Sequence, residues 1–254
     1  MVCHMLLTLL ISCAPIAAPE GFDDLNSFLF ENFHERSKVV EAGVENLYAW
    51  LPENEQALED GYRVENLSAA AIESVEQAPP DQLIGIATSL DIPYSVDEIA
   101  YAQFAIDPED LSPDTDGYND RSFITDPDCF LDHSCELIQY QSKVKTLLPL
   151  NIEVVTSIFS EARWVDTEWG SAYIQRRYIT EDTEISVDWV SVDSEYGFII
   201  TLPQENGTTK RIEAMWVNMT MNDMPVPENL ATQLALGALK DSIMTTTTYL
   251  DENQ

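Results

Sequence analysis

A succession of β-rich runs between residues 137 and 221 is the feature that most constrains the fold of this chain. Gly170 and the Asn206-Gly207 pair punctuate them, and an Asn-Gly pair favours a tight hairpin. Runs joined by hairpins pair antiparallel, so the sequence predicts one antiparallel sheet. The predicted strands are 137–148, 150–165, 171–180, 185–192, 196–202 and 210–221.

Helices are predicted before and after this sheet. Pro227 can occupy the first turn of a final helix that runs to about Leu250. Ahead of the sheet, residues 82–95 favour a further strand, and Ser95 with Glu98 three residues later forms a capping box that begins a helix. One long helix can cover one face of a curved antiparallel sheet. We therefore expect an α+β fold in which the sheet curves around the C-terminal helix.

Residues 24–81 are expected to form a helical appendage and a connector ahead of the main domain. Apolar side chains recur at helical spacing over 24–51, and Pro52 is expected to end that helix. Ser68 is a good N-cap for a second short helix within the connector. Farther along, residues 107–128 are crowded with Asp, Pro, Gly and Asn and are expected to form a long loop.

The charge of the chain excludes one class of partner. Forty-five acidic residues against twelve Lys and Arg give a formal charge of -33 at pH 7. A field of this sign repels phosphate backbones and anionic membrane surfaces, so nucleic-acid binding is not expected. The acidity is spread along the whole chain. It fits adaptation to a salty habitat, and binding of cations or of a basic partner is the alternative.

The N-terminus resembles the export signal of bacterial lipoproteins. Residues 1–12 form an apolar run too short to span a membrane, and Leu10-Ile11-Ser12-Cys13 resembles the lipobox in which the cysteine takes a lipid. The resemblance implies removal of residues 1–12, lipidation of Cys13, and a tether over 13–23. Ala14 after the cysteine implies the outer membrane, and hence a location in the cell envelope. The alternative is a buried N-terminal strand with an incidental cysteine.

Cys129 and Cys135 remain as a pair once Cys3 is lost with the signal. In an oxidising compartment we expect them to form a disulfide that pins a local turn. A zinc site is the alternative, although only His133 lies nearby and there is no second Cys-x-x-Cys pair.

No motif for catalysis or for cofactor binding stands in the sequence. There is no Gly-x-Ser-x-Gly, no phosphate-binding glycine loop, and no histidine in metal-ligand spacing. Residues 114–120 resemble part of a calcium loop, but Phe123 would occupy the position that needs a bidentate acid. We therefore expect no enzyme activity, no cofactor and no metal. Calcium binding at 114–120 is kept as an alternative.

The order of the elements resembles the START-like, or SRPBCC, helix-grip superfamily. Residues 84–104 look like its opening strand and helix, and 227–250 like its closing helix. The resemblance covers residues 82–254 and implies a cavity between sheet and helix. The whole chain is also similar to a group of uncharacterised lipoproteins from myxobacteria, on the phrases at 128–135 and 163–167.

A wall for this cavity can be nominated from the predicted strands and the final helix. Gly237 and Ala238 would leave space beside the helix, and arginines 163, 176 and 177 fall in predicted strands, where one could hold an acidic group. An ordinary core, and arginines paired with nearby carboxylates, are the alternatives. The candidate ligand-binding residues are Phe159, Arg163, Tyr173, Arg176, Trp189, Phe198, Trp216, Leu236, Leu239 and Ile243.

These observations predict a membrane-anchored lipoprotein that binds or carries a small apolar or amphipathic ligand. Burial of apolar surface would drive binding. The main alternative is a solidly packed module that engages another protein of the cell envelope. An enzyme that uses the cavity is a third hypothesis.

Overall fold

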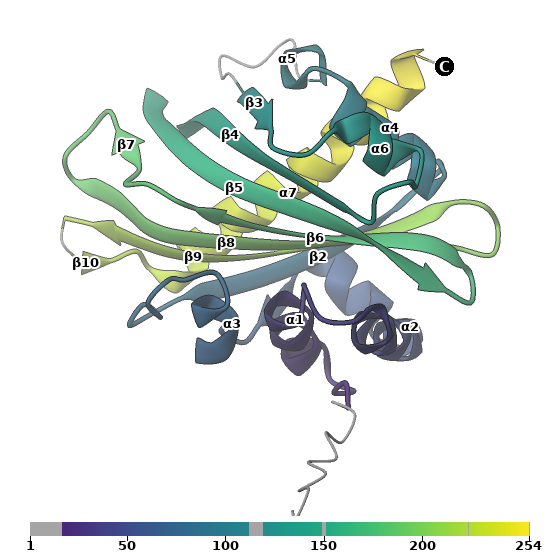
Figure 1. The fold of residues 1–254 in the computed structure, drawn as a ribbon. Helices are drawn as coiled ribbons and strands as arrows, with labels where there is room; N and C mark the ends of the chain where they lie inside the picture. The colour runs from purple at the N-terminus through teal and green to yellow at the C-terminus, as the bar shows by residue number, and fades with distance from the viewer. Residues whose placement is uncertain (1–16, 112–118, 149–150, 223, 254) are drawn as a thin grey trace, which may run out of the picture.

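The computed structural model describes residues 17–111, 119–148, 151–222 and 224–253. Over these residues, ten strands form one antiparallel sheet, and helices pack against both of its faces (Figure 1). The sheet is curved, and a long helix ends the chain. This confirms the predicted fold class.

The strands bear out most of the predicted runs. In chain order they are β1 (Tyr62–Val64), β2 (Ile84–Ile92), β3 (Asn119–Phe123), β4 (Leu137–Leu148), β5 (Ile152–Thr167), β6 (Gly170–Ile179), β7 (Glu184–Ile185), β8 (Val190–Pro203), β9 (Thr209–Met221) and β10 (Met224–Pro225). Along the sheet the order is β1-β2-β9-β8-β6-β5-β4-β3, with β10 paired to β9 and β7 to β5.

One strand differs from its prediction. The predicted runs 185–192 and 196–202 are wrong as separate strands, because β8 begins at Val190 and continues without a break to Pro203, while Ile185 belongs to the short strand β7. The pairing of β8 with β9 shifts register between Val192 and Ser194. A β-bulge of this kind absorbs an extra residue and bends the strand without ending it.

Seven helices complete the described part of the chain. They are α1 (Phe22–Glu31), α2 (Ser37–Asp60), α3 (Ala69–Glu73), α4 (Val96–Ala105), α5 (Pro108–Leu111), α6 (Pro127–Leu131) and α7 (Glu228–Asn253). The capping box of Ser95 and Glu98 is present at α4, and the Ser68 side chain accepts a hydrogen bond from Ala71 N at the start of α3. Both confirm the predicted helix starts.

The prediction that Pro52 ends the first long helix is wrong. Pro52 lies inside α2, which continues to Asp60. Its side chain is exposed, whereas Leu51 before it and Leu58 after it are buried in the core. Tertiary packing on both sides of the proline therefore holds the last turns of the helix.

The two faces of the sheet carry different helices (Figure 1). Helices α1, α2 and α3 pack against one face, which we call the appendage face, together with strand residues such as Phe198 and Trp216. Helices α7 and α4 pack against the other, the grip face, where Ile86 contacts α7 and Tyr173 contacts α4. The N-terminal appendage thus shares the largest core of the molecule with the sheet.

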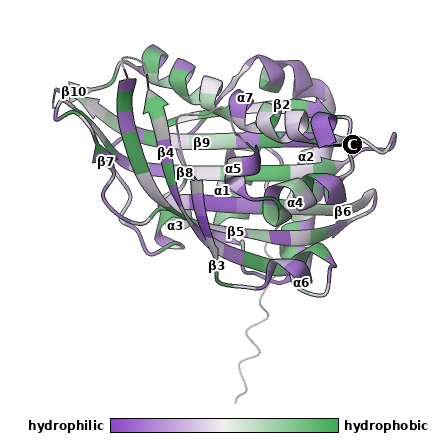
Figure 2. Cartoon of the chain, turned by 90° about the horizontal axis from the view of Figure 1, so that it is seen from above, coloured by the Kyte–Doolittle hydropathy of each residue, from purple (hydrophilic) through white to green (hydrophobic). Residues whose placement is uncertain are grey.

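Helix α7 covers only part of the grip face. Its main contacts with the sheet are made to β2 and β9, near one side. Figure 2 looks onto this face and shows α7 along that side, with the strands in the middle of the sheet not covered by it. Two pockets lie between α7 and these strands.

Candidate functional site

A cavity lies on the grip face between α7 and the strands. Its first part, the apolar arm, has a volume of about 300 Å³. On the helix side it is lined by Ala231, Ala235 and Ala238, and on β9 by apolar side chains that include Met215 and Val217. Because alanine side chains are short, α7 does not fill the space above the sheet here.

A second part, the polar arm, adjoins the first and has a volume of about 250 Å³. Val144, Ile158, Arg177 and Ser242 line both arms, which places the two arms side by side. The remaining lining of the polar arm is rich in amides, hydroxyls and guanidinium groups. The whole cavity is therefore apolar at one end and hydrogen-bonding at the other.

A chain of hydrogen bonds stiffens the polar end. The Tyr173 hydroxyl donates to Gln103 Oε1 at 2.7 Å, Gln103 Nε2 donates to Gln175 Oε1 at 2.5 Å, and Gln175 Nε2 donates to the Tyr140 hydroxyl at 2.8 Å. Burial raises the pKa of Tyr173, so its hydroxyl stays protonated at neutral pH and keeps its role as a donor.

Two of the arginines that line the polar arm are engaged by the protein itself. Arg211 Nε donates to Glu213 Oε1 at 2.7 Å, and a terminal nitrogen of Arg211 donates to Gln103 Oε1 at 3.0 Å. Arg121 donates to the backbone oxygens of Gln103 and Ile106. The guanidinium groups of both arginines are therefore already hydrogen-bonded within the protein, to side chains or to the C-terminal end of α4.

Arg177 differs from both. It lines the two arms at their junction, and its Nε is buried without a hydrogen-bond partner. Within the described residues it takes part in no ion pair. It lies opposite Gly197 of β8, where a Cβ atom would clash with the Arg177 side chain. The glycine allows the side chain to lie across the neighbouring strand.

None of the ten candidate ligand-binding residues lines either arm. Phe198 and Trp216 belong to the core beneath α1, α2 and α3. The side chain of Phe159 points to the same appendage face of the sheet. Side chains of a strand point alternately to opposite faces, so these residues cannot reach the cavity. Their assignment to it is corrected.

Arg163 and Arg176 also lie on the appendage face, where each is paired. Arg163 Nε donates to Glu136 at 2.6 Å, and Arg163 also donates to Phe33 O at 2.8 Å. Arg176 Nε donates to Glu161 at 2.6 Å. These arginines join the sheet to the end of α1, and the alternative of pairing with carboxylates is the one observed.

The other candidates lie on or beside the grip face but outside the cavity. Leu239 packs with Ile86, Leu236 packs beside it, and Ile243 packs with Ile99 of α4. Tyr173 belongs to the hydrogen-bonded chain described above, and Trp189 borders a small cluster near β7. These helix residues therefore hold α7 against the sheet and α4, while Ala231, Ala235 and Ala238 of the same helix line the cavity.

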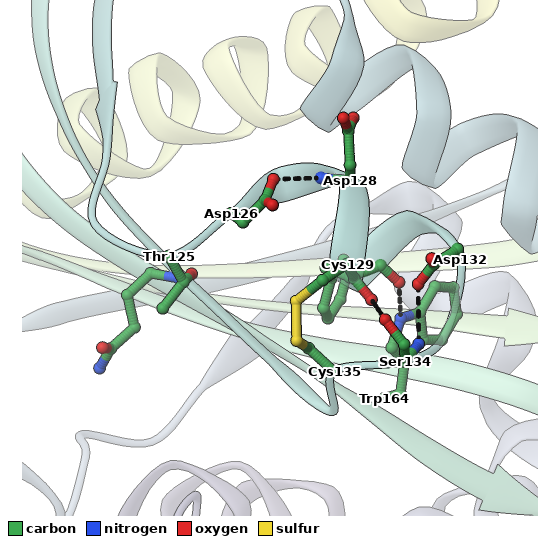
Figure 3. Close-up of a disulfide and its surroundings, with 10 residues drawn as sticks. Thr125, Asp126, Asp128, Cys129, Asp132, Ser134, Cys135 and Trp164 are labelled. Carbon is green, nitrogen blue, oxygen red and sulfur yellow. Dashed lines mark hydrogen bonds between the residues drawn. A yellow bond between two sulfur atoms is a disulfide. The ribbon is translucent and has the colours of Figure 1, made fainter.

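The predicted disulfide between Cys129 and Cys135 is present (Figure 3), with the two Cα atoms 5.2 Å apart. Cys135 N donates to Cys129 O at 2.8 Å, which closes the turn after α6. His133 stacks on Trp164 with ring centroids 4.1 Å apart. Because both thiols are bonded to each other, zinc binding by this pair does not fit the structure.

Among the described residues, one group of carboxylates is close enough to hold a metal ion: Glu55, Glu59 and Asp91. The ammonium group of Lys210 lies among them, 2.9 Å from Asp91 and 3.6 Å from Glu59. The lysine supplies the positive charge that these acids require. Residues 114–118 of the calcium-like phrase lie outside the described residues, while Asn119 and Asp120 begin β3.

Cys13 and the apolar run 1–12 also lie outside the described residues. In the part of the chain that is described, no helix is long and apolar enough to cross a membrane.

The sequence matches no protein family profile, and no curated protein is similar to it. Several solved structures resemble the fold at low identity. A START superfamily protein from Mycobacterium smegmatis is 9% identical, with a TM-score of 0.42 over 67% of this chain and 99% of that one. The Zhui aromatase/cyclase from Streptomyces sp. R1128 is 7% identical, with a TM-score of 0.41 over 66% of this chain and 91% of that one.

Norcoclaurine synthase from Thalictrum flavum, in complex with dopamine and hydroxybenzaldehyde, is 14% identical, with a TM-score of 0.37 over 68% of this chain and 89% of that one. Two of these three structures are named as enzymes. The expectation that the chain is not an enzyme is corrected accordingly.

Ala231 and Ala235 of α7 and Gly197 of β8 are the site residues that sequence reasoning missed, whereas Ala238 and Arg177 were among its expectations. Ala231 and Ala235 stand four residues apart, a spacing that places both on one face of a helix. A run of small residues on the buried face of a predicted gripping helix was the signal that could have indicated a cavity.

Proposed function

We propose that the protein binds a small apolar or amphipathic molecule in the cavity between α7 and the sheet. The observation that supports this is the junction of an apolar arm with a hydrogen-bonding arm at Ile158 and Arg177. Apolar surface that enters the first arm would drive binding, at about 25 cal/mol per Å² before ordering costs. Polar groups of the second arm would orient the molecule.

The test is uptake of a neutral apolar dye, Nile red, by the purified chain, together with native mass spectrometry for a retained small molecule. Ala235→Phe should fill the apolar arm and abolish dye binding. Gln233→Phe is the matched control, because Gln233 is exposed on α7 and does not line the cavity. A protein that takes up no dye and retains no molecule would remove the proposal.

The location of the domain is a second part of the proposal. The lipobox-like Leu10-Ile11-Ser12-Cys13 supports a lipid anchor on Cys13 that holds the domain at a membrane of the cell envelope, facing the periplasm or the exterior. In a bacterial host, Cys13→Ser should move the full chain from the detergent phase to the aqueous phase, while Cys3→Ser should not. Equal partitioning of both variants would contradict the anchor.

A further inference from the structure

The polar arm is lined by basic side chains, although the protein as a whole is strongly acidic. Its lining includes Arg121, Arg177 and Arg211, and among the described residues it includes no aspartate or glutamate. The whole chain has 45 acidic and only 12 basic residues. Three of those basic residues therefore line the polar arm, whose described lining contains no acidic side chain. This composition favours an acidic ligand over a basic one.

Arg177 is the group in this lining that a ligand could engage. Arg211 is paired with Glu213, and Arg121 is bonded to backbone oxygens. Arg177 has a buried Nε without a partner, and a buried, unpaired donor is costly unless something binds it. Gly197 gives its side chain room to lie against the sheet at the junction of the two arms.

We infer that the bound molecule carries a carboxylate, and that Arg177 holds this group where the arms meet while the apolar part of the molecule lies in the apolar arm. A guanidinium group can bind a carboxylate through two parallel hydrogen bonds. The inference rests on the proposed function, since it specifies the ligand class for the same cavity. Glu195 lines the apolar arm and supplies the competing hypothesis, an amine that pairs with this carboxylate.

The test compares three probes that share one apolar chain and differ in the head group: decanoate, decanol and decylamine. Each is used to displace Nile red at neutral pH from the wild type, Arg177→Met, Arg177→Lys and Arg36→Met. Arg36 is exposed at the start of α2, so Arg36→Met removes the same charge away from the cavity. Circular dichroism shows whether each variant folds.

We expect the wild type to bind decanoate about 10-fold or more tightly than decanol, the effect of one charge-assisted hydrogen-bonded pair. Arg177→Met should remove this preference, while Arg177→Lys and Arg36→Met should keep it. Equal binding of decanoate and decanol by the wild type, or tighter binding of decylamine, would overturn the inference and leave the proposed function standing. Failure of all three probes to displace bound Nile red would overturn the inference, whereas the proposed function falls only if the protein takes up no dye and retains no molecule.

Discussion

The appendage face and the grip face belong to the same sheet but are filled to different extents. On the appendage face, Phe198 and Trp216 pack with Leu29 and Phe30 of α1, and all four side chains are almost fully buried. On the grip face, α7 places Ala235 and its neighbouring alanines above the sheet and leaves a cavity of two arms. The first face is built for stability, whereas the second leaves room for another molecule.

Two adjacent arginines show the same difference at the scale of single residues. Arg176 points to the appendage face, where it donates to Glu161 and to Phe30 O, both at 2.6 Å. Arg177 points to the grip face and has no such partner among the described residues. Substitutions at these two positions can therefore measure what each face contributes.

The largest expected effect is on stability. Arg176→Met should lower the free energy of unfolding by about 3–5 kcal/mol, because it removes the buried cation that pairs with the Glu161 carboxylate and leaves that group, within the described residues, only the hydrogen bonds of His34 and Gln139. Arg177→Met, the matched substitution one residue away, should change it by no more than about 0.5 kcal/mol. Denaturant unfolding of both variants checks this. Similar losses for the two would break the comparison between the faces.

The next effect concerns pH. Burial would by itself raise the pKa of Glu161, but hydrogen bonds from His34 and Gln139 and the charge of Arg176 outweigh it and lower the pKa from 4.5 to about 2. A carboxyl group whose pKa is lowered by folding stabilises the fold at every pH above its pKa in the unfolded chain. This stabilisation is lost as pH falls from about 4.5 toward 2.

Protonation of Glu161 should therefore lower the free energy of unfolding by about 3 kcal/mol, the value that corresponds to its change in pKa on folding. Unfolding measured across this pH range should show a steeper fall for the wild type than for Glu161→Gln, which cannot titrate. Parallel pH profiles for the two proteins would mean that Glu161 is not held as a charged group.

The smallest effect comes from filling space. Ala235→Leu should increase the free energy of unfolding by about 1 kcal/mol, because added methyl groups enter an existing cavity, and should reduce Nile red binding. Ala214→Leu on the filled appendage face is the contrast and should destabilise by about 1–3 kcal/mol. Thermal unfolding distinguishes the two. A loss of stability in Ala235→Leu would mean that the apolar arm is already filled.

Much of the fold could be predicted from local sequence signals. The β-rich runs, the capping box at Ser95 and the cap at Ser68 are properties of short segments, and the structure contains both caps and most of the runs. Pro52 misled the prediction because the force that extends α2 past it is packing against the sheet, which no local pattern contains.

The site was harder to predict because it depends on strand register. A shift of one residue moves a side chain to the opposite face, so Arg176 and Arg177 could be assigned only once the sheet was known. Large residues such as Trp216 were nominated as a cavity wall, yet a cavity persists where side chains are small. Coverage of the appendage face by α1 and α2 is a long-range contact and was not visible in the sequence.

The glycine beneath Arg177 has a consequence for the energetics of recognition. Because Gly197 lets the arginine lie flat along β8, its guanidinium is preorganised and need not be immobilised when a ligand arrives. Ordering a flexible side chain on binding costs about 0.5–1.5 kcal/mol. The Arg177 side chain is ordered when the protein folds, so this entropy loss does not reduce the affinity for a ligand. For the ligand proposed above, affinity would therefore depend in part on the absence of a side chain at Gly197 of the neighbouring strand.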